Sequence, residues 1–311
     1  MTSHRPAVIL DCDPGHDDAI AILVAARHSE LLGITTVSGN VALELTTRNA
    51  LITAQLSGLS TPVHAGATRP LVAPTRHAEF IHGDTGLNGP RLPPLTRRPA
   101  DDDAVRFIIE TARAQDGVWL IATGPLTNVA MALRSAPDLV ERLQGISIMG
   151  GSSSFGNITP TAEFNIYADP EAAAVVFGSG ARLVMAGLDL THQFMIDSSA
   201  IGRIRELGSV ASDFTADLLT FYVTAYAEVS SGQTAGPLHD PCAVLAITHP
   251  HLFTSTPRHV AVELTGTHTR GMTVVDTRQV RHQEAANATV LEHIDEQAAL
   301  ELLLATIASY S

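Results

Sequence analysis

Lysine is absent from this chain of 311 residues, which has only two cysteines and one tryptophan. Two cysteines far apart, Cys12 and Cys242, form neither a disulfide framework nor a paired zinc motif, which favours a reducing compartment. No stretch of about 18 apolar residues is present, so no membrane-spanning helix is expected. The first apolar run stops at Asp11, too early for a secretory signal peptide, so the expected location is the cytoplasm.

Positive charge is also scarce. The chain has 19 Lys and Arg residues against 32 Asp and Glu residues, and its formal net charge is −13. This balance argues against the large basic surface that a nucleic-acid partner needs, so no nucleic acid is expected to bind. Hydrophobic residues make up 45% of the sequence, which is enough for a globular core. We find no repeat and no linker, and therefore expect one domain over residues 1–311.

Short apolar runs alternate with helical patterns along the first two-thirds of the chain. The expected strands cover residues 7–12, 31–37, 63–65, 118–122, 146–149 and 183–186. The expected helices cover residues 17–28, 43–56, 104–114, 126–133 and 170–177. The last third predicts helices at 211–229 and 296–307, and strands at 259–264 and 272–275. This alternation predicts an α/β fold with an open, mostly parallel sheet and helices on both faces.

The strongest local signal is an acidic segment where the first strand meets the first helix. Its sequence is Asp11-Cys12-Asp13-Pro14-Gly15-His16-Asp17-Asp18. In a parallel sheet this junction is the carboxyl edge, where ligands bind. Clustered carboxylates need raised pKa values or a cation, and Ca²⁺ accepts irregular sets of oxygen ligands. Helix capping alone explains one or two of these residues, and Asp11 is expected to support the loop from behind.

Together with four later segments, this acidic segment resembles the inosine–uridine nucleoside hydrolase family. The later segments follow in the expected order along nearly the whole chain. They are Val37-Ser38-Gly39-Asn40, Thr123-Gly124-Pro125-Leu126-Thr127-Asn128, Met149-Gly150-Gly151 with Ala162-Glu163-Phe164-Asn165, and His239-Asp240-Pro241-Cys242. The resemblance implies a Rossmann-like nucleoside hydrolase fold, a small ribonucleoside substrate and a homo-oligomer, either a dimer or a tetramer.

The resemblance also implies a role for individual residues. The carboxylates of Asp13, Asp18 and Asp240 match the family's calcium ligands, and Thr123 matches a ligand through its backbone carbonyl. Asp13 also matches the general base that activates the attacking water.

Further matches concern the nucleoside. Asp17, Asn40 and Asn165 match contacts to the ribose 2′- and 3′-hydroxyls, and Asn157 and Glu163 match contacts to the 5′-hydroxyl. His82 and His239 match positions near the nucleobase and are candidate catalytic residues. Candidate substrate-binding residues are Met149 in the ribose pocket, Phe164 beside the ribose contacts and Tyr226 in the wall of the base pocket.

These residue types suit the cleavage of an N-glycosidic bond. The transition state places positive charge on the ribose, which carboxylates and amide oxygens favour. A cation helps to deprotonate water, a carboxylate takes the proton, and a histidine beside the base is a plausible proton donor. A site built around two hydroxyls predicts a preference for ribose over 2′-deoxyribose.

The choice of nucleobase is less constrained. Trp119 lies in an expected buried strand, so the tryptophan stacking of one purine-specific branch is not expected, and pyrimidine nucleosides are favoured. Purine-preferring or permissive hydrolysis is the first alternative. A magnesium-dependent phosphatase of the haloacid-dehalogenase type and a non-catalytic nucleoside binder are the others. The absence of lysine argues against the phosphatase, because that family uses a lysine to contact phosphate.

Overall fold

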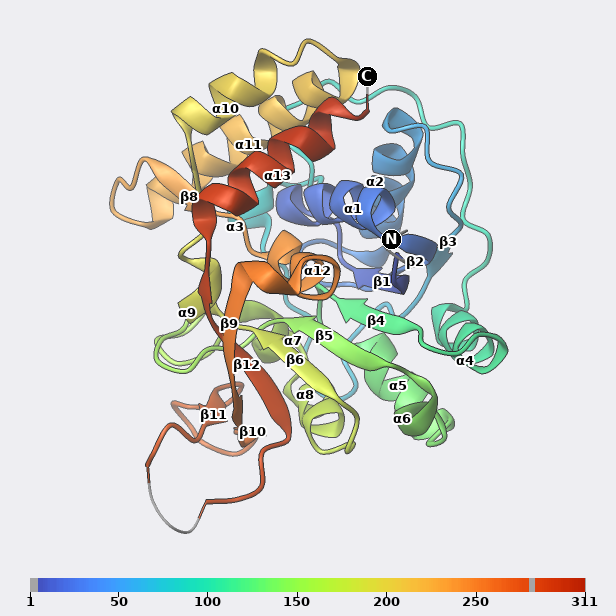
Figure 1. Cartoon of the computed structure of the whole chain (residues 1–311), viewed down its shortest axis with the longest axis vertical. Helices are drawn as coiled ribbons and strands as arrows, with labels where there is room; N and C mark the ends of the chain where they lie inside the picture. Colours follow the sequence, from blue (N-terminus) through green and yellow to red (C-terminus); the bar gives the residue numbers. More distant parts are fainter. Residues whose placement is uncertain (1–4, 280–282, 311) are drawn as a thin grey trace.

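The computed structural model describes residues 5–279 and 283–310 (Figure 1). Its central sheet contains, in spatial order, β3 (Val63–Ala65), β2 (Glu30–Thr36), β1 (Ala7–Cys12), β4 (Trp119–Ala122), β5 (Gly145–Met149), β6 (Leu183–Ala186), β12 (Ala288–Ile294) and β9 (Phe253–Arg258). Every neighbouring pair is parallel except β12 with β9. The predicted open, mostly parallel α/β sheet is therefore confirmed.

Two layers of helices cover the sheet (Figure 1). Along β1, Val8 and Leu10 join one hydrophobic cluster, whereas Ala7 and Ile9 join the other, because successive side chains of a strand point to opposite faces. The first cluster is completed by α1 (His16–His28), α2 (Leu43–Leu56), α10 (Ser198–Arg205), α11 (Val210–Val229), α12 (Asp240–Thr248) and α13 (Glu296–Ala308). The second is completed by α4 (Ala104–Ala114), α5 (Thr127–Ser135), α6 (Leu139–Arg142) and α8 (Pro170–Phe177).

Shorter elements lie around this framework. They are α3 (Glu79–His82), α7 (Phe164–Ala168), α9 (Leu188–Thr191), the 3-10 helix Pro250–Leu252, and two small antiparallel pairs, β7 (Met195–Asp197) with β8 (Ala235–Pro237) and β10 (Val260–Val262) with β11 (Thr273–Val275).

The last third of the chain corrects the sequence analysis. The strands expected at 259–264 and 272–275 form the separate β10–β11 pair, while β12 and β9, which were not expected, extend the central sheet. The sequence of β9, Phe-Thr-Ser-Thr-Pro-Arg, is mostly polar and contains Pro257. Such a sequence gives a weak strand signal, and its place at the sheet edge is what makes the proline tolerable.

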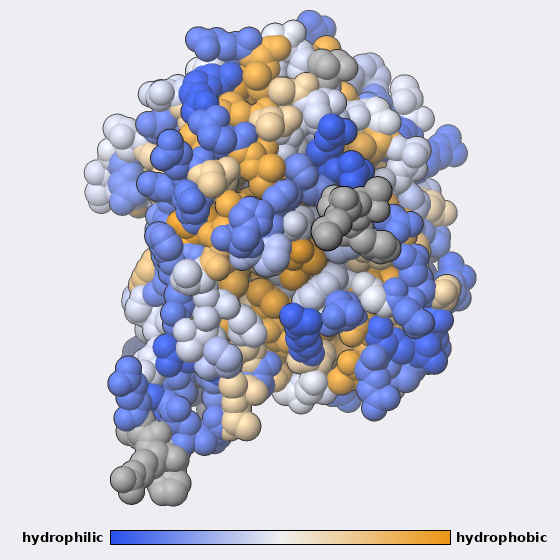
Figure 2. Space-filling model, viewed as in Figure 1, coloured by the Kyte–Doolittle hydropathy of each residue, from blue (hydrophilic) through white to orange (hydrophobic). Residues whose placement is uncertain are grey.

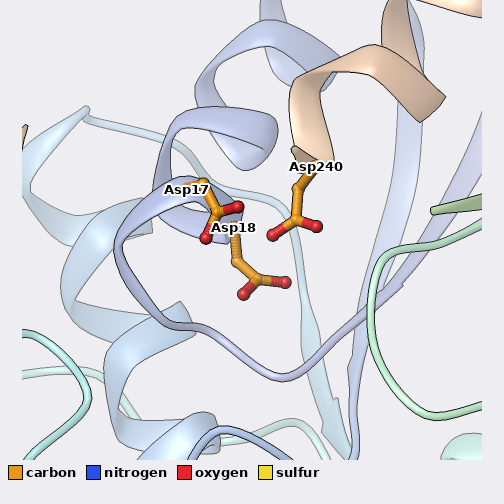
Figure 3. Close-up of side chains that lie close together, drawn as sticks. All are labelled: Asp17, Asp18 and Asp240. Atoms are coloured by element: carbon orange, nitrogen blue, oxygen red, sulfur yellow. The ribbon is translucent and has the colours of Figure 1, made fainter. Parts of the chain in front are cut away.

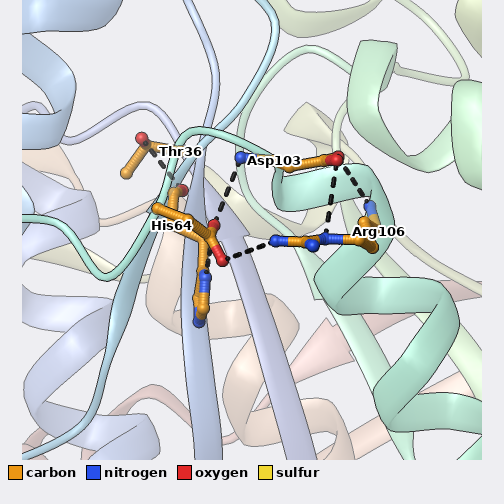
Figure 4. A network of polar contacts seen from close by, with 5 residues as sticks. Thr36, His64, Asp103 and Arg106 are labelled. Atoms are coloured by element: carbon orange, nitrogen blue, oxygen red, sulfur yellow. Dashed lines mark hydrogen bonds and ion pairs between the residues drawn. The ribbon is translucent and has the colours of Figure 1, made fainter.

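A polar network joins the other edge of the sheet to α4 (Figure 4). His64 of β3 lies 2.8 Å from a carboxylate oxygen of Asp101, which also accepts from the backbone N–H of Asp103 at 3.2 Å. Asp103 caps α4 by accepting from the N–H of Arg106 at 3.0 Å. The run of aspartates at 101–103 therefore leads into α4 and supplies its N-cap.

The surface of the molecule is mixed. Figure 2 shows hydrophilic residues over much of one face, with a band of hydrophobic residues between them. Within residues 5–279 and 283–310, no helix combines the length and the apolar character required to cross a membrane.

Candidate active site

A cavity of about 320 Å³ lies at the carboxyl ends of the central strands, as expected for a parallel sheet. Every site residue singled out from the sequence lines it except Asp13 and Asp18, which are completely buried beside it. The lining residues that were expected are Asp17, Asn40, His82, Thr123, Met149, Asn157, Glu163, Phe164, Asn165, Tyr226, His239 and Asp240. Segments from the whole length of the chain thus converge on one cavity.

Three carboxylates meet where two helices begin (Figure 3). Asp17 and Asp18 lie in the first turn of α1, and Asp240 is the first residue of α12. One oxygen from each lies within 4.8 Å of the others. Helix N-termini favour negative charge, which helps to hold these carboxylates together. Asp17 was expected at the sugar and not at the metal, yet its carboxylate lies together with those of Asp18 and Asp240.

The electrostatics of this cluster suit a cation. Burial, and then the charge of Asp18, raise the pKa of Asp17 to about 7. Burial, and then the charges of Asp17 and Asp18, raise the pKa of Asp240 well above its usual value. In the described part of the chain, no Arg or His forms an ion pair with these carboxylates. A cation at this point would remove the repulsion that the protein itself leaves uncompensated.

Asp13 is held beside this cluster. Its Oδ2 accepts a hydrogen bond from the backbone N–H of Asn40 at 2.6 Å, and the Asn40 side chain donates to Asp18 Oδ2 at 3.1 Å. Asp13 Oδ1 is buried and has no hydrogen-bond partner among the described residues. Burial, and then the charge of Asp18, raise the pKa of Asp13 well above its usual value. An unpaired buried carboxylate oxygen is costly, so this atom is suited to a cation or a water molecule.

The segment around Glu163 forms one side of the cavity. Glu163 caps α7 and accepts from the N–H groups of Asn165 at 2.9 Å and Gly151 at 3.0 Å. Burial raises the pKa of the Glu163 carboxyl to about 7. The amide of Asn165 donates to the carbonyl of Thr123 at 2.7 Å. A short helix, α7, begins here although none was expected, and Phe164 lines the cavity as well.

Histidine and tyrosine side chains also line the cavity. His239 Nδ1 lies 2.7 Å from the hydroxyl of Thr191, and burial lowers the pKa of His239 to about 3. Burial also lowers the pKa of His82 well below its usual value. Both imidazoles are therefore neutral near pH 7. His82 is the last residue of α3 and is buried.

Several lining residues were not identified from the sequence. Phe155 and His192 contact each other edge to face, with ring centroids 5.1 Å apart, and both line the cavity. They lie in loops without a motif, so no local signal marks them. Tyr222, which lies in α11 like Tyr226, also lines the cavity, and its hydroxyl donates to the carbonyl of Pro237 at 2.8 Å.

Comparison with known proteins agrees with this geometry. The family model described as inosine-uridine preferring nucleoside hydrolase matches residues 8–301. The pyrimidine-specific ribonucleoside hydrolase RihA of Escherichia coli (strain K12) is 43% identical over 308 residues, covering 98% of this chain and 99% of RihA.

Solved structures give the same result. A purine-preferring ribonucleoside hydrolase from Gardnerella vaginalis has a TM-score of 0.91 and 34% identity, covering 98% of both chains. A plant nucleoside hydrolase has a TM-score of 0.90 and 32% identity, covering 98% of this chain and 99% of its own. These matches exclude the haloacid-dehalogenase alternative. The chain belongs to the inosine-uridine preferring nucleoside hydrolase family and is an enzyme of the ribonucleoside hydrolase class.

Proposed function

We propose that the protein hydrolyses the N-glycosidic bond of pyrimidine ribonucleosides, uridine and cytidine, to ribose and free base. The observation that carries this proposal is the group of buried carboxylates, Asp17, Asp18 and Asp240, beside a cavity lined by amide and histidine side chains. The similarity to RihA, whose name is pyrimidine-specific, supports the choice of base.

Ca²⁺ is the proposed cofactor. The side chains of Asp13, Asp18 and Asp240 would hold it, together with the carbonyl of Thr123, which has a second lone pair beside the one that Asn165 occupies. The unpaired Asp13 Oδ1 and an all-oxygen donor set fit a hard cation that tolerates irregular coordination. When bound, Ca²⁺ would make a water easier to deprotonate and would attract the vicinal hydroxyls of the ribose.

Asp13 is the proposed general base. Its buried and unpaired Oδ1 suits a carboxylate that takes a proton from water. The oxygen of that water bonds to ribose C1′, the bond from C1′ to the base nitrogen breaks, and the base leaves with the bonding electrons and takes up a proton. Asp17, Asn40 and Asn165 would orient the 2′- and 3′-hydroxyls, and Glu163 and Asn157 the 5′-hydroxyl.

Replacement of Asp13 by alanine tests the base. We expect Asp13→Ala to lower kcat on uridine by at least about 1000-fold, the upper part of the range for general bases. Circular dichroism and the melting temperature would check the fold, and Asp102→Ala, at the exposed start of α4, is the matched control. Near-normal turnover in Asp13→Ala would exclude Asp13 as the base.

A reducing-sugar assay tests the substrate and the metal. Ribose release would be measured from uridine, cytidine, inosine and adenosine, with Ca²⁺ and with a chelator. We expect release from the two pyrimidine nucleosides, lost with the chelator and restored by Ca²⁺. Release mainly from inosine or adenosine would favour the purine-preferring alternative, which the Gardnerella vaginalis neighbour supports. No release from any nucleoside would contradict the proposal.

Three expectations about the whole protein stay predictions. We propose that one domain over residues 1–311 assembles into a homo-oligomer, a dimer or a tetramer, and works in the cytoplasm on a free ribonucleoside. Sedimentation velocity on the purified protein would test the assembly, and a monomer at micromolar concentration would contradict it.

A further inference from the structure

His16 is buried against the active site, but none of the roles described above uses it. It is the first residue of α1 and does not line the cavity. Its ring lies beside those of His82 and Phe221, with centroids 5.3 Å and 5.2 Å away and planes inclined by 21° and 8°. His82 does line the cavity, so His16 lies directly behind a residue that is expected to face the substrate.

Hydrogen bonds fix where the proton of His16 lies. His16 Nε2 is 2.8 Å from the backbone carbonyl oxygen of Asn88. A carbonyl can only accept, so Nε2 carries the hydrogen. A neutral imidazole has one N–H, which leaves His16 Nδ1 as an acceptor. No carboxylate is hydrogen-bonded to either ring in the described part of the chain, so nothing there favours an imidazolium.

The contact between the two rings then fixes the proton of His82. His16 Nδ1 lies 3.0 Å from His82 Nδ1, so the hydrogen of this bond must come from His82. The opposite tautomer of His82 would accept from the backbone N–H of His16 at 3.3 Å, but it would also place two lone pairs 3.0 Å apart. The shorter contact therefore favours the Nδ1–H form of His82.

We propose that His16 is a positioning residue that holds His82 as its Nδ1–H tautomer, so that His82 Nε2 presents a lone pair to the bound nucleoside. His82 Nε2 has no hydrogen-bond partner among the described residues. It is also not one of the fully buried unpaired polar atoms, and His82 lines the cavity. The substrate group that meets it must donate, as a ring N–H of the base or a ribose hydroxyl does. His82 then binds the nucleoside and is not the proton donor to the leaving base. This inference rests on the ribonucleoside hydrolase function.

The surroundings are built to keep this pair in contact. A Cβ atom on Gly15 would lie 2.5 Å from His82 Nδ1, so only glycine permits the approach. The amide of Asn49 donates to the carbonyl of Pro14 at 3.0 Å and to that of Thr85 at 2.8 Å. Asn49 thereby ties the start of α1 to the loop that carries Asn88. The acceptor of His16 is thus fixed by the fold.

Nitrogen-15 NMR of the histidine rings tests the tautomer without turnover. The protein would be labelled at histidine, and His82→Gln would assign the His82 signals. We expect His82 at neutral pH to carry its hydrogen on Nδ1, with Nε2 unprotonated. Phe221→Leu, which removes the aromatic ring beside His16 but keeps both hydrogen bonds, should leave this pattern unchanged. A hydrogen on His82 Nε2, or on both nitrogens, would overturn the proposal.

Steady-state kinetics tests the role of His16. His16→Phe keeps a ring but loses both nitrogens, whereas His16→Asn keeps an acceptor near the position of Nδ1. We expect KM for uridine to rise about tenfold in His16→Phe, the equivalent of one hydrogen bond, with kcat changed less than about threefold. His16→Asn should recover most of the loss. If KM rose equally in the two variants, and in proportion to their loss of melting temperature, His16 would have only a structural role.

Two substrate analogues identify the donor. 3-Methyluridine lacks the ring N–H, and 5′-deoxyuridine lacks the 5′-hydroxyl. Whichever group meets His82, the penalty of His16→Phe should disappear with the analogue that lacks it and persist with the other. A penalty that persists with both would contradict a hydrogen bond from either group to His82. If the wild-type enzyme released no ribose from uridine, the function would fail, while the NMR result would stand separately.

Discussion

At the scale of single residues, two glycines decide where Asp13 can lie. A Cβ atom on Gly39 would lie 2.0 Å from Asp13 Oδ2, and one on Gly124 would lie 2.5 Å from Asp13 Oδ1. The carboxylate is therefore clamped between two positions without side chains. Sequence motifs contain both glycines, but only the three-dimensional structure shows that they serve the same side chain.

Gly39→Ala should consequently inactivate the enzyme while leaving it folded. The methyl group would displace Asp13, and a shift of about 1 Å at a reacting group can cost about 100-fold in rate. We expect kcat on uridine to fall by at least about that factor, measured by reducing-sugar release.

Gly202→Ala is the control for this variant. A Cβ atom there would meet nothing within 4 Å, and the residue lies within α10. Alanine favours the helix by roughly 0.5–1 kcal/mol over glycine, so this variant should be as active as the wild type and slightly more stable. Full activity in Gly39→Ala would show that Asp13 is not confined as described.

The proposed contacts to the sugar predict discrimination against 2′-deoxyuridine. Asp17, Asn40 and Asn165 line the cavity and are buried, so a missing hydroxyl would leave some of their polar groups without a partner. We expect kcat/KM for 2′-deoxyuridine to be at least about 1000-fold below that for uridine. The comparison needs only the wild-type enzyme, and similar values for the two substrates would remove the 2′-hydroxyl from the proposed recognition.

At the scale of elements, the site is the meeting point of two helix N-termini. The starts of α1 and α12 bring Asp17, Asp18 and Asp240 together. The opposite end of α1 is also closely packed. There His28 Nε2 lies 2.7 Å from the hydroxyl of Thr306 on α13, and its ring meets His249 edge to face at 4.7 Å.

This packing predicts a loss of stability in acid. Burial, followed by the charges of His249, Arg27 and Arg5, lowers the pKa of His28 to about 4, against a usual value of 6.5. Between these two values the unfolded chain binds more protons than the folded one, so stability falls as the pH drops from 6.5 to 4. His28→Gln should flatten this part of the profile in urea unfolding, whereas His268→Gln, on an exposed loop, should not. Identical profiles for wild type and His28→Gln would contradict this assignment.

At the scale of the whole molecule, the proposed cation should stabilise the fold. A ligand that binds only the folded state contributes about 2.7 kcal/mol at a concentration of 100 times its Kd. For a chain of this size we expect the melting temperature to rise by roughly 5 °C with Ca²⁺ relative to chelator. Asp240→Asn should lose most of this shift in differential scanning fluorimetry. An unchanged melting temperature in the wild type would argue against a resident cation.

Prediction from sequence succeeded where a local pattern carries the signal. Parallel strands with apolar residues on both sides, such as β1, and helices with clear boundaries, such as α2, were found where expected. It failed for the mostly polar edge strand β9 and for the short helix α7, neither of which was predicted.

The sequence by itself determined the α/β class, the acidic loop after the first strand and the family motifs, because each of these depends on residues that are close together in the chain. Only the tertiary structure placed Asp17 with Asp240, enclosed Asp13 between Gly39 and Gly124, and set His16 behind His82. Those contacts join segments far apart in the chain. Their geometry follows from how the sheet and helices pack as a whole, which no local pattern encodes.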